Sequence, residues 1–502
     1  MSLVLQNIIR RCPSTIITKG FFRFWSSNGQ FPSHPMGTEE YENQPRKSLT
    51  ELPDELTEHE DKPKFISEYE TTKDGWEWVD NVLFKSKIPE PPNHSTPSGW
   101  VPPNPTLARQ WSYFVDRDRF HSYALYHSFN LAVLNVGAPA GGVNATIRSI
   151  VRYGLCEGHN TFAIFDGFEG LINNQVKSLQ WTAVNGWSSV GGSLLGCQKT
   201  SAAKVGLAAV AEKVRENNFH ALFVIGGYEA YLSVLQMYDA RSTHPEFQIP
   251  LICIPATISN NVPGTEFSIG ADTALNEIVK ICDKIKQSAQ GSKRRIFVIE
   301  TMGGYCGYLA TMAALASGAD QAYIYEEPFT IKDLIDDVDH LRKKMEGHLK
   351  RGLLLRNEMA NEHYSTDFIT KLLQEEGKGV FSARSNVLGH MQQGGLPSPF
   401  DRAFGTKLGC KAVTYAVSLI EQAATEEGKV VCNTPASAVV LGLIKRQNEF
   451  TPVETLKSNT DIEHRMPLEQ WWLKLRPLLR ILAKHESVYV GDFVETSIDD
   501  VD

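Results

Sequence analysis

The stretch that decides the fold is residues 250–290, PLICIPATISNNVPGTEFSIGADTALNEIVKICDKIKQSAQ. It begins with a short apolar run, Pro250–Pro255, which predicts a buried strand. It ends with Asp272–Gln290, where apolar residues recur at spacings of three and four and predict an amphipathic helix. A strand, a loop and a helix in this order are typical of parallel α/β sheets, in which ligand-binding residues follow the strands.

The same alternation continues on both sides of this stretch. Further buried strands are predicted at Leu131–Val136, Leu222–Ile225, Arg295–Ile299 and Ala322–Tyr325. Further helices are predicted at Asn144–Leu155, Ala202–Asn217, Tyr308–Ser317 and Ile331–Leu349. We therefore predict an α/β fold with parallel sheets covered by helices on both faces, preceded by a largely irregular N-terminal region.

Composition favours a folded protein and disfavours several functional classes. The chain has 502 residues, 42% hydrophobic and 22% charged, with a net charge of -8, so length alone suggests about three domains. This charge gives no general reason to bind nucleic acid, and a small acidic metabolite would need a local basic pocket. Eight scattered cysteines without a CxxC pair are typical of a reducing compartment. No apolar stretch is long enough for a membrane span.

The two ends of the chain differ in composition from its middle. Residues 1–38 contain no Asp or Glu but several Arg and Lys, which is typical of a mitochondrial targeting segment; an unstructured tail is the alternative. Residues 39–75 are rich in charged residues, Pro, Ser and Thr, and are predicted to be a disordered linker. Residues 491–502 form an acidic tail.

Residues 76–127 form a segment rich in tryptophan and proline. It contains PEPP at 89–92, TPSGWVPP at 96–103 and YFV at 113–115. These motifs resemble part of the mitochondrial large-subunit ribosomal protein L49 family. The resemblance implies ribosomal RNA or protein as partners of this segment. A fusion of two genes is an alternative interpretation.

Two glycine-rich turns follow predicted strands. The first is GAPAGGVN at 137–144, and the second is GGYEAY at 226–231. Such turns expose backbone N–H groups at a helix N-terminus, where an anion binds readily. Neither has the Lys and Ser/Thr of a Walker loop, so a plain strand-to-helix turn is the alternative. Gly137, Gly226 and Gly227 are the candidate nucleotide-loop residues.

Four further segments make the pattern specific. They are PATISNNVPGTE at 255–266, ETMGGYCGY at 300–308, LRNE at 355–358 and LGHMQQGG at 388–395. In this order and spacing, these segments resemble the eukaryotic ATP-dependent 6-phosphofructokinase family, and specifically the C-terminal regulatory half of those enzymes. The resemblance covers residues from about 129 to about 485, within a predicted domain at 128–490. The resemblance implies two lobes with parallel sheets, a glycolytic, cytoplasmic and allosteric enzyme that forms a tetramer, and ATP and Mg²⁺ as cofactors of the complete enzyme.

The residues that move the phosphoryl group depart from the family's active pattern. Tyr228 stands where active members carry an Asp that helps hold magnesium-nucleotide, and Ser259 stands where they carry the catalytic base. General-base catalysis contributes typically about 10²–10⁴-fold. The first glycine loop departs too, because Ala138 and Pro139 replace Gly and Asp and crowd a triphosphate. We therefore expect no catalytic residue, no metal site and no bound nucleotide in this half.

The sugar-phosphate residues are retained. The resemblance assigns to an effector site, for fructose 2,6-bisphosphate or a related sugar phosphate, the following positions: Lys199, Thr257, Ile258, Ser259, Asn260, Asn261, Arg295, Met302, Gly303, Gly304, Glu358, Arg384, His390, Met391, Gln392, Gln393 and Arg465. Charge-assisted hydrogen bonds contribute roughly 1.5–3 kcal/mol each, so the cations of this set favour tight phosphate binding.

Each assignment has an ordinary structural alternative. Arg295 and Arg384 could be solvated surface cations, Glu358 could form a surface ion pair with Arg356, and His390 could be structural. For the whole chain three hypotheses follow: a regulatory half that acts with a catalytic phosphofructokinase half, an independently active 6-phosphofructokinase, and a mitochondrial ribosomal protein.

Overall fold

The computed structural model describes residues 128–290, 294–346, 350–423 and 431–484, together with the backbone of two short strands near the N-terminus. The chain divides into two compact units, Met1–Val101 and Pro102–Asp502. In the first unit, β1 (Trp76–Val79) and β2 (Val82–Lys85) form an antiparallel pair. The predicted targeting segment, the linker, most of the tryptophan-rich segment and the acidic tail lie outside the described residues.

The second unit contains a seven-stranded sheet in the described part of the chain, in the order β13-β12-β7-β6-β3-β4-β5. The strands from β12 to β4 run parallel, whereas the edge strands β5 and β13 are antiparallel to their neighbours. Their bounds are β3 Asn130–Val136, β4 Asn160–Ile164, β5 Val176–Ser178, β6 Ala221–Gly226, β7 Leu251–Pro255, β12 Ala438–Ile444 and β13 Gln447–Pro452.

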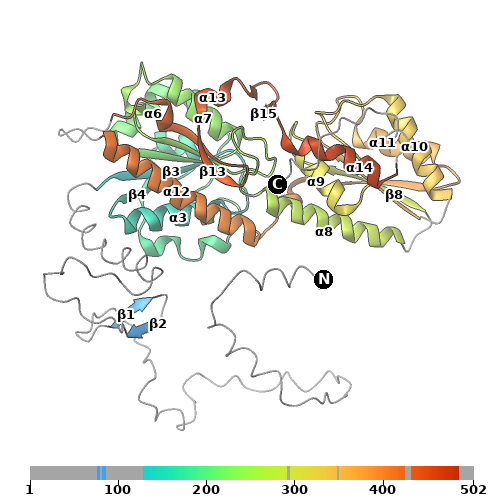
Figure 1. Ribbon diagram of the computed structural model, residues 1–502, viewed down its shortest axis with the longest axis horizontal. Coiled ribbons are helices and arrows are strands. Elements are labelled where there is room, and N and C mark those ends of the chain that lie inside the picture. Colours follow the sequence, from blue (N-terminus) through green and yellow to red (C-terminus); the bar gives the residue numbers. More distant parts are fainter. Residues whose placement is uncertain are drawn as a thin grey trace, which may run out of the picture. The chain divides into compact units, whose positions relative to one another are not determined.

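Alternating side chains of these strands pack into two separate cores. Leu131, Val133 and Phe223 point to one face, where the long helices α3 (Val143–Cys156) and α12 (Pro399–Ala423) cover them. Leu134 and Val224 point to the other face, which a second set of helices covers (Figure 1). The helices on that side are α4 Gly167–Ile172, α5 Ala202–Val205, α6 Leu207–Glu216, α7 Tyr228–Asp239 and α13 Val453–Lys457. A sheet that is buried on both faces explains why the strands read as continuous apolar runs.

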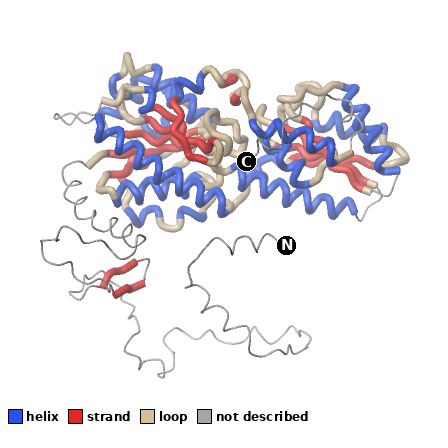
Figure 2. The backbone as a smooth tube through the Cα atoms, in the orientation of Figure 1, coloured by secondary structure: helices blue, strands red, loops and turns tan. Residues whose placement is uncertain are grey.

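A second lobe is built on a four-stranded parallel sheet in the order β11-β8-β10-β9. The strands are β8 Arg295–Thr301, β9 Gln321–Tyr323, β10 Arg351–Asn357 and β11 Ser382–Val387. Helices α8 (Ala271–Gln290) and α9 (Tyr308–Ser317) cover one face, and α10 (Ile331–Glu346) and α11 (Thr366–Glu376) cover the other, as Figure 2 shows. The predicted α/β class, with helices on both faces of parallel sheets, is confirmed.

The C-terminal segment connects the two lobes. It contains β14 (Thr460–Asp461), β15 (Met466–Pro467) and α14 (Arg476–Leu482). Trp471 Nε1 donates to Glu266 O at 2.8 Å beside the large lobe, while Trp472 is buried in the core of the small lobe. The short 3-10 helices are η2 Trp181–Val184, η3 Trp187–Ser189, η4 Pro245–Phe247, η5 Gly389–Gln393, η6 Pro435–Ser437 and η7 Trp471–Leu475.

Most predicted elements agree with the structure to within two residues, but one helix does not. The single helix predicted at Ala202–Asn217 is wrong, because it is two helices separated at Gly206. Gly206 has φ +112 and ψ 109, a conformation that only glycine adopts readily and that cannot continue a helix. Within the described residues, no helix is long and apolar enough to cross a bilayer.

Candidate functional site

The loop after β7 carries the first group of candidate residues. Asn260 has φ 53 and is buried; its Nδ2 donates to Glu266 O at 3.0 Å and its Oδ1 accepts from Ser268 N at 2.7 Å. Asn260 therefore holds the loop in shape and has little left to offer a ligand. Ile258 likewise packs against both lobes' cores. Thr257 Oγ1 accepts from Ser259 N at 3.3 Å, and the half-buried Ser259 hydroxyl makes no hydrogen bond to the described residues.

The loop after β8 is fixed by two side chains from other elements. Gln392 is fully buried; its Oε1 accepts from Met302 N at 3.0 Å and its Nε2 donates to Met302 O at 3.1 Å. Glu358 Oε1 accepts from Gly303 N at 3.0 Å and from Gly304 N at 2.8 Å. The two side chains together clamp the backbone of this loop. Glu358 Oε2 has no hydrogen bond within the described residues and could accept one from a ligand hydroxyl.

Arg356 is not the surface ion-pair partner of Glu358 that the sequence left open as an alternative. Arg356 is buried, and its Nη1 lies 3.3 Å from Glu300 Oε2. It also donates from Nη1 to Glu358 O at 3.0 Å and from Nη2 to Asn361 O at 2.9 Å. Burial lowers the pKa of Arg356, and its bonds anchor the loop that follows β10. The surface-pair interpretation is therefore wrong, since the partner of Arg356 is Glu300.

The C-terminal segment brings Arg465 to this region. Arg465 has φ 57, and its carbonyl oxygen accepts from Asn261 Nδ2 at 2.8 Å. The neighbouring His464 lies 2.7 Å from Asp461 Oδ2 through Nδ1, and its Nε2 lies 2.8 Å from Tyr325 Oη. Hydrogen bonds from His464 hold the pKa of Asp461 below its usual range. The His464 ring also contacts Tyr305, which follows Gly304, so this segment joins the loops after β7 and β8.

The two glycine turns lie side by side at the ends of β3 and β6. Gly226 has no room for a side chain, because a Cβ there would lie 1.7 Å from Val136 O. Tyr228, two residues after Gly226, is 3% exposed and packs in the core against Tyr231, with ring centroids 5.8 Å apart. Burial raises the pKa of Tyr228 to about 12. Its side chain therefore faces the interior of the lobe.

The remaining candidate cations lie apart from these loops. Arg295 is at the amino end of β8, and Arg384 on β11 is in register with Phe297. β8 spans seven residues, so its two ends are roughly 20 Å apart at about 3.3 Å per residue. Within one copy of the chain, Arg295 and the clamped loop after β8 therefore lie at opposite ends of the small sheet.

Other predicted residues are exposed near the strand ends. Lys199 is exposed and follows Gln198, whose carbonyl oxygen accepts from Gly137 N at 2.9 Å. His390 and Met391 are exposed and Gln393 is partly exposed, all three in η5 after β11. The structure thus brings Thr257–Asn261 and Arg465 together, and Met302–Gly304 with Glu358 and Gln392.

A family model described as phosphofructokinase matches residues 130–416, which include the four-stranded sheet, the strands β3 to β7 of the seven-stranded sheet and most of these loops. The chain belongs to this family. It is 56% identical over 360 residues to the platelet-type ATP-dependent 6-phosphofructokinase of Homo sapiens, covering 72% of this chain and 46% of that protein. It is also 56% identical over 356 residues to the muscle-type enzyme of Mus musculus, covering 71% and 45%. The chain thus spans about half the length of the curated relatives it matches.

Solved structures agree with this membership. Phosphofructokinase from Saccharomyces cerevisiae superimposes with a TM-score of 0.67 at 36% identity, covering 71% of this chain and 47% of that chain. Pichia pastoris phosphofructokinase in the T-state gives 0.69 at 35% identity, covering 76% and 44%. A pyrophosphate-dependent phosphofructokinase from Nitrosospira multiformis shares the fold, with a TM-score of 0.55 at 16% identity, covering 70% of this chain and 91% of that chain.

The ATP-dependent enzymes of the phosphofructokinase family use ATP and Mg²⁺, and the residues of the glycine turns can be compared with that requirement. The resemblance sets Tyr228 at the position of a magnesium-holding carboxylate, and the Tyr228 side chain is in the core. Among the residues that the structure describes, no three His, Cys, Asp or Glu side chains are grouped as a metal site. The buried Tyr228 does not fit a magnesium-nucleotide at this turn.

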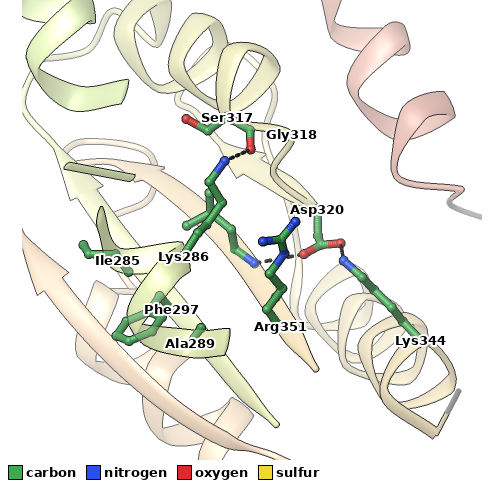
Figure 3. A pocket seen from close by; sticks show the side chains of 11 residues that line it. Ile285, Lys286, Ala289, Phe297, Ser317, Gly318, Asp320, Lys344 and Arg351 are labelled. Atoms are coloured by element: carbon green, nitrogen blue, oxygen red, sulfur yellow. Dashed lines mark hydrogen bonds and ion pairs between the residues drawn. The ribbon is translucent and has the colours of Figure 1, made fainter. Parts of the chain in front are cut away.

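This phosphofructokinase module also has a basic cavity that motif reasoning missed. It has a volume of about 50 Å³ and lies between α8, α9, α10 and β10. Figure 3 shows Lys344 beside Asp320 and Lys286 pointing toward Ser317, with Arg351 between them on the cavity wall. Lys286 Nζ donates to Ser317 O at 2.8 Å, and Asp320 accepts from Lys344 and from Leu353 N.

Two of the three cations at this cavity are already paired, Lys286 with Asp283 at 2.8 Å and Lys344 with Asp320. No local motif signals it, because its side chains come from separate elements that only the packing of the lobe brings together.

Proposed function

We propose that this phosphofructokinase module is a regulatory half: it binds fructose 2,6-bisphosphate or a related sugar phosphate and does not transfer a phosphoryl group itself. In this proposal it acts together with a catalytic half, which turns fructose 6-phosphate and ATP into fructose 1,6-bisphosphate and ADP. One contrast in the sequence supports the proposal. The residues that the resemblance assigns to sugar-phosphate binding are retained, while those that it assigns to phosphoryl transfer are replaced.

The replaced residues argue against catalysis in this half. Ser259 is a neutral hydroxyl near neutral pH and cannot accept a proton from a sugar hydroxyl, which removes a contribution of about 10²–10⁴-fold. Tyr228 is buried in the core and offers no oxygen to a metal ion. Phosphoryl transfer depends on metal and positioned charge, so the two losses compound.

The retained residues support binding of a sugar. Gly303 and Gly304 leave the loop after β8 without side chains, and Glu358 holds both of their amides. A sugar ring can approach such a backbone closely, and the second oxygen of Glu358 is available to a hydroxyl group. Arg465 lies beside the loop after β7, and the ring of its neighbour His464 contacts Tyr305 of the loop after β8.

The position of Arg295 and Arg384 bears on assembly. Both lie away from the clamped loop of their own chain, so we propose that a second chain supplies these two arginines to the site. Family resemblance supports a tetramer of full-length chains in which sugar sites lie at subunit contacts. A ligand whose two phosphates contact two chains favours the arrangement in which those chains lie close together.

Calorimetric titration of the purified full chain with fructose 2,6-bisphosphate tests the proposal. Arg384→Ala and Arg295→Ala are each expected to weaken binding by about 2 kcal/mol or more, roughly 30-fold, because each removes a charge-assisted contact to phosphate. Arg215→Ala is the matched control, since Arg215 is 65% exposed on α6 and pairs only with surface carboxylates among the described residues.

Two results would overturn the proposal. The first is an unchanged dissociation constant in both arginine variants, which would remove the site assignment. The second is turnover of fructose 6-phosphate at ordinary phosphofructokinase rates in a coupled assay by this chain without a catalytic half.

A further inference from the structure

Arg465 has a charged partner that lies far from it in the sequence. Its Nη1 is 3.2 Å from Oε1 of Glu229, in the first turn of α7. The Glu229 side chain is 19% exposed and the Arg465 side chain 56% exposed, so the pair lies at the edge of the site. Glu229 directly follows Tyr228, the residue that stands where a magnesium-binding carboxylate would be.

The backbone of Arg465 is already fixed by other contacts. Its carbonyl oxygen accepts from Asn261 Nδ2, and the preceding His464 is held by Asp461 and Tyr325. These bonds place the Cα of Arg465 but leave its long side chain free to rotate. Among the described residues, only Glu229 makes an ion pair with its guanidinium, and Nε and Nη2 have no hydrogen-bond partner there.

The glycine turns make room for this carboxylate. Oε2 of Glu229 would lie 3.4 Å from a Cβ at Gly137 and 3.7 Å from one at Gly227. The carboxylate thus rests over the two turns, next to backbone that carries no side chain. Gly137 has φ +113, a left-handed conformation that favours glycine, so the space is built into the backbone.

We infer that Glu229 is a positioning residue of the sugar-phosphate site: it holds the guanidinium of Arg465 by one nitrogen and leaves the other donors to a ligand phosphate. The inference rests on the proposed function, since it names how that same site is organised. An arginine held in place loses less rotational freedom when the ligand binds, and its planar group can serve a carboxylate and a phosphate at once.

A double-mutant cycle in the full chain tests this assignment by calorimetry with fructose 2,6-bisphosphate. Glu229→Gln is expected to weaken binding by about three- to tenfold, because the side chain keeps its size but loses its charge. Arg465→Ala is expected to weaken binding by about tenfold or more. In the double variant the loss is expected to equal that of Arg465→Ala alone, since Glu229 acts only through Arg465.

Asp239→Asn is the matched control. Asp239 lies at the other end of α7 and pairs with Lys457 at 3.0 Å on the surface. This variant is expected to leave the dissociation constant unchanged. The unfolding midpoint of each unliganded variant is recorded alongside, and Glu229→Asp, which keeps the charge on a shorter stem, replaces Glu229→Gln in the cycle if the glutamine variant does not fold.

The outcomes separate this inference from the function on which it rests. Binding by the unmodified chain with no effect of Glu229→Gln, or with losses that add in the double variant, would overturn the role of Glu229 alone. Absence of binding by the unmodified chain would overturn the proposed function, and the positioning role with it.

Discussion

The proposed function sets Tyr228 where a catalytic half would carry a metal-binding carboxylate, and the structure predicts that Tyr228→Asp destabilises the large lobe and does not restore that carboxylate. Tyr228 is 3% exposed and packs against Tyr231 in the core below the glycine turn. Its hydroxyl is buried without a hydrogen-bond partner among the described residues. An aspartate at this position would therefore be buried among apolar side chains and would not face a ligand.

The expected magnitude follows from two losses. Truncating a buried aromatic side chain costs about 3–5 kcal/mol, and burying an unpaired carboxyl group adds to this. We expect Tyr228→Asp to lose at least about 4 kcal/mol, a large fraction of the roughly 5–15 kcal/mol by which domains are stable. Tyr228→Phe, the matched control, removes only the unpaired hydroxyl and is expected to gain up to about 1 kcal/mol.

Urea unfolding of the full-length variants, followed by far-ultraviolet circular dichroism, measures these changes. Ser259→Asp provides the comparison at the other altered position, where a half-exposed loop side chain is expected to cost less than about 1 kcal/mol. Ser259→Asp alone is expected to give no phosphoryl transfer, since the buried Tyr228 remains at the position that we propose for the metal carboxylate. An unfolding midpoint for Tyr228→Asp equal to that of Ser259→Asp would refute the inward orientation of Tyr228.

Two further predictions concern groups whose environment the packing fixes. His159 is buried, and burial lowers its pKa to about 4. Its contribution to the free energy of unfolding is therefore fully present above a pH of about 6.5 and is lost as the pH falls toward 4. In urea unfolding at several pH values, His159→Gln is expected to reduce this pH dependence by up to about 3 kcal/mol, whereas the same pH dependence in both proteins would contradict the pKa shift. Gln392→Leu leaves the amide and carbonyl of Met302 without their side-chain partner. We expect the free energy of local opening to fall by about 2 kcal/mol, so that hydrogen exchange at the Met302 amide becomes roughly 30-fold faster. Unchanged exchange would show that Gln392 does not hold this loop.

The local sequence determined much of the fold, because the signals it carries are short-range. A run such as Pro250–Pro255 is apolar on both faces, and this alone identifies a strand buried between two layers of helices. Tyr308–Ser317 begins and ends as its apolar spacing predicts. The prediction of one helix at Ala202–Asn217 was wrong because the spacing of apolar residues carries no information about the backbone angles of a single glycine.

The positions of the site's side chains were decided by tertiary structure. The sequence named Glu358, Gln392 and Arg465, but only packing showed that Gln392 is fully buried and that Glu358 is bound to two amides. The same holds for the distance between Arg295 and the clamped loop, which depends on the direction of β8. Contacts between residues such as Glu229 and Arg465, 236 positions apart, leave no periodic trace in the chain. They arise because the two lobes and the C-terminal segment fold against one another, and no local preference encodes that distance.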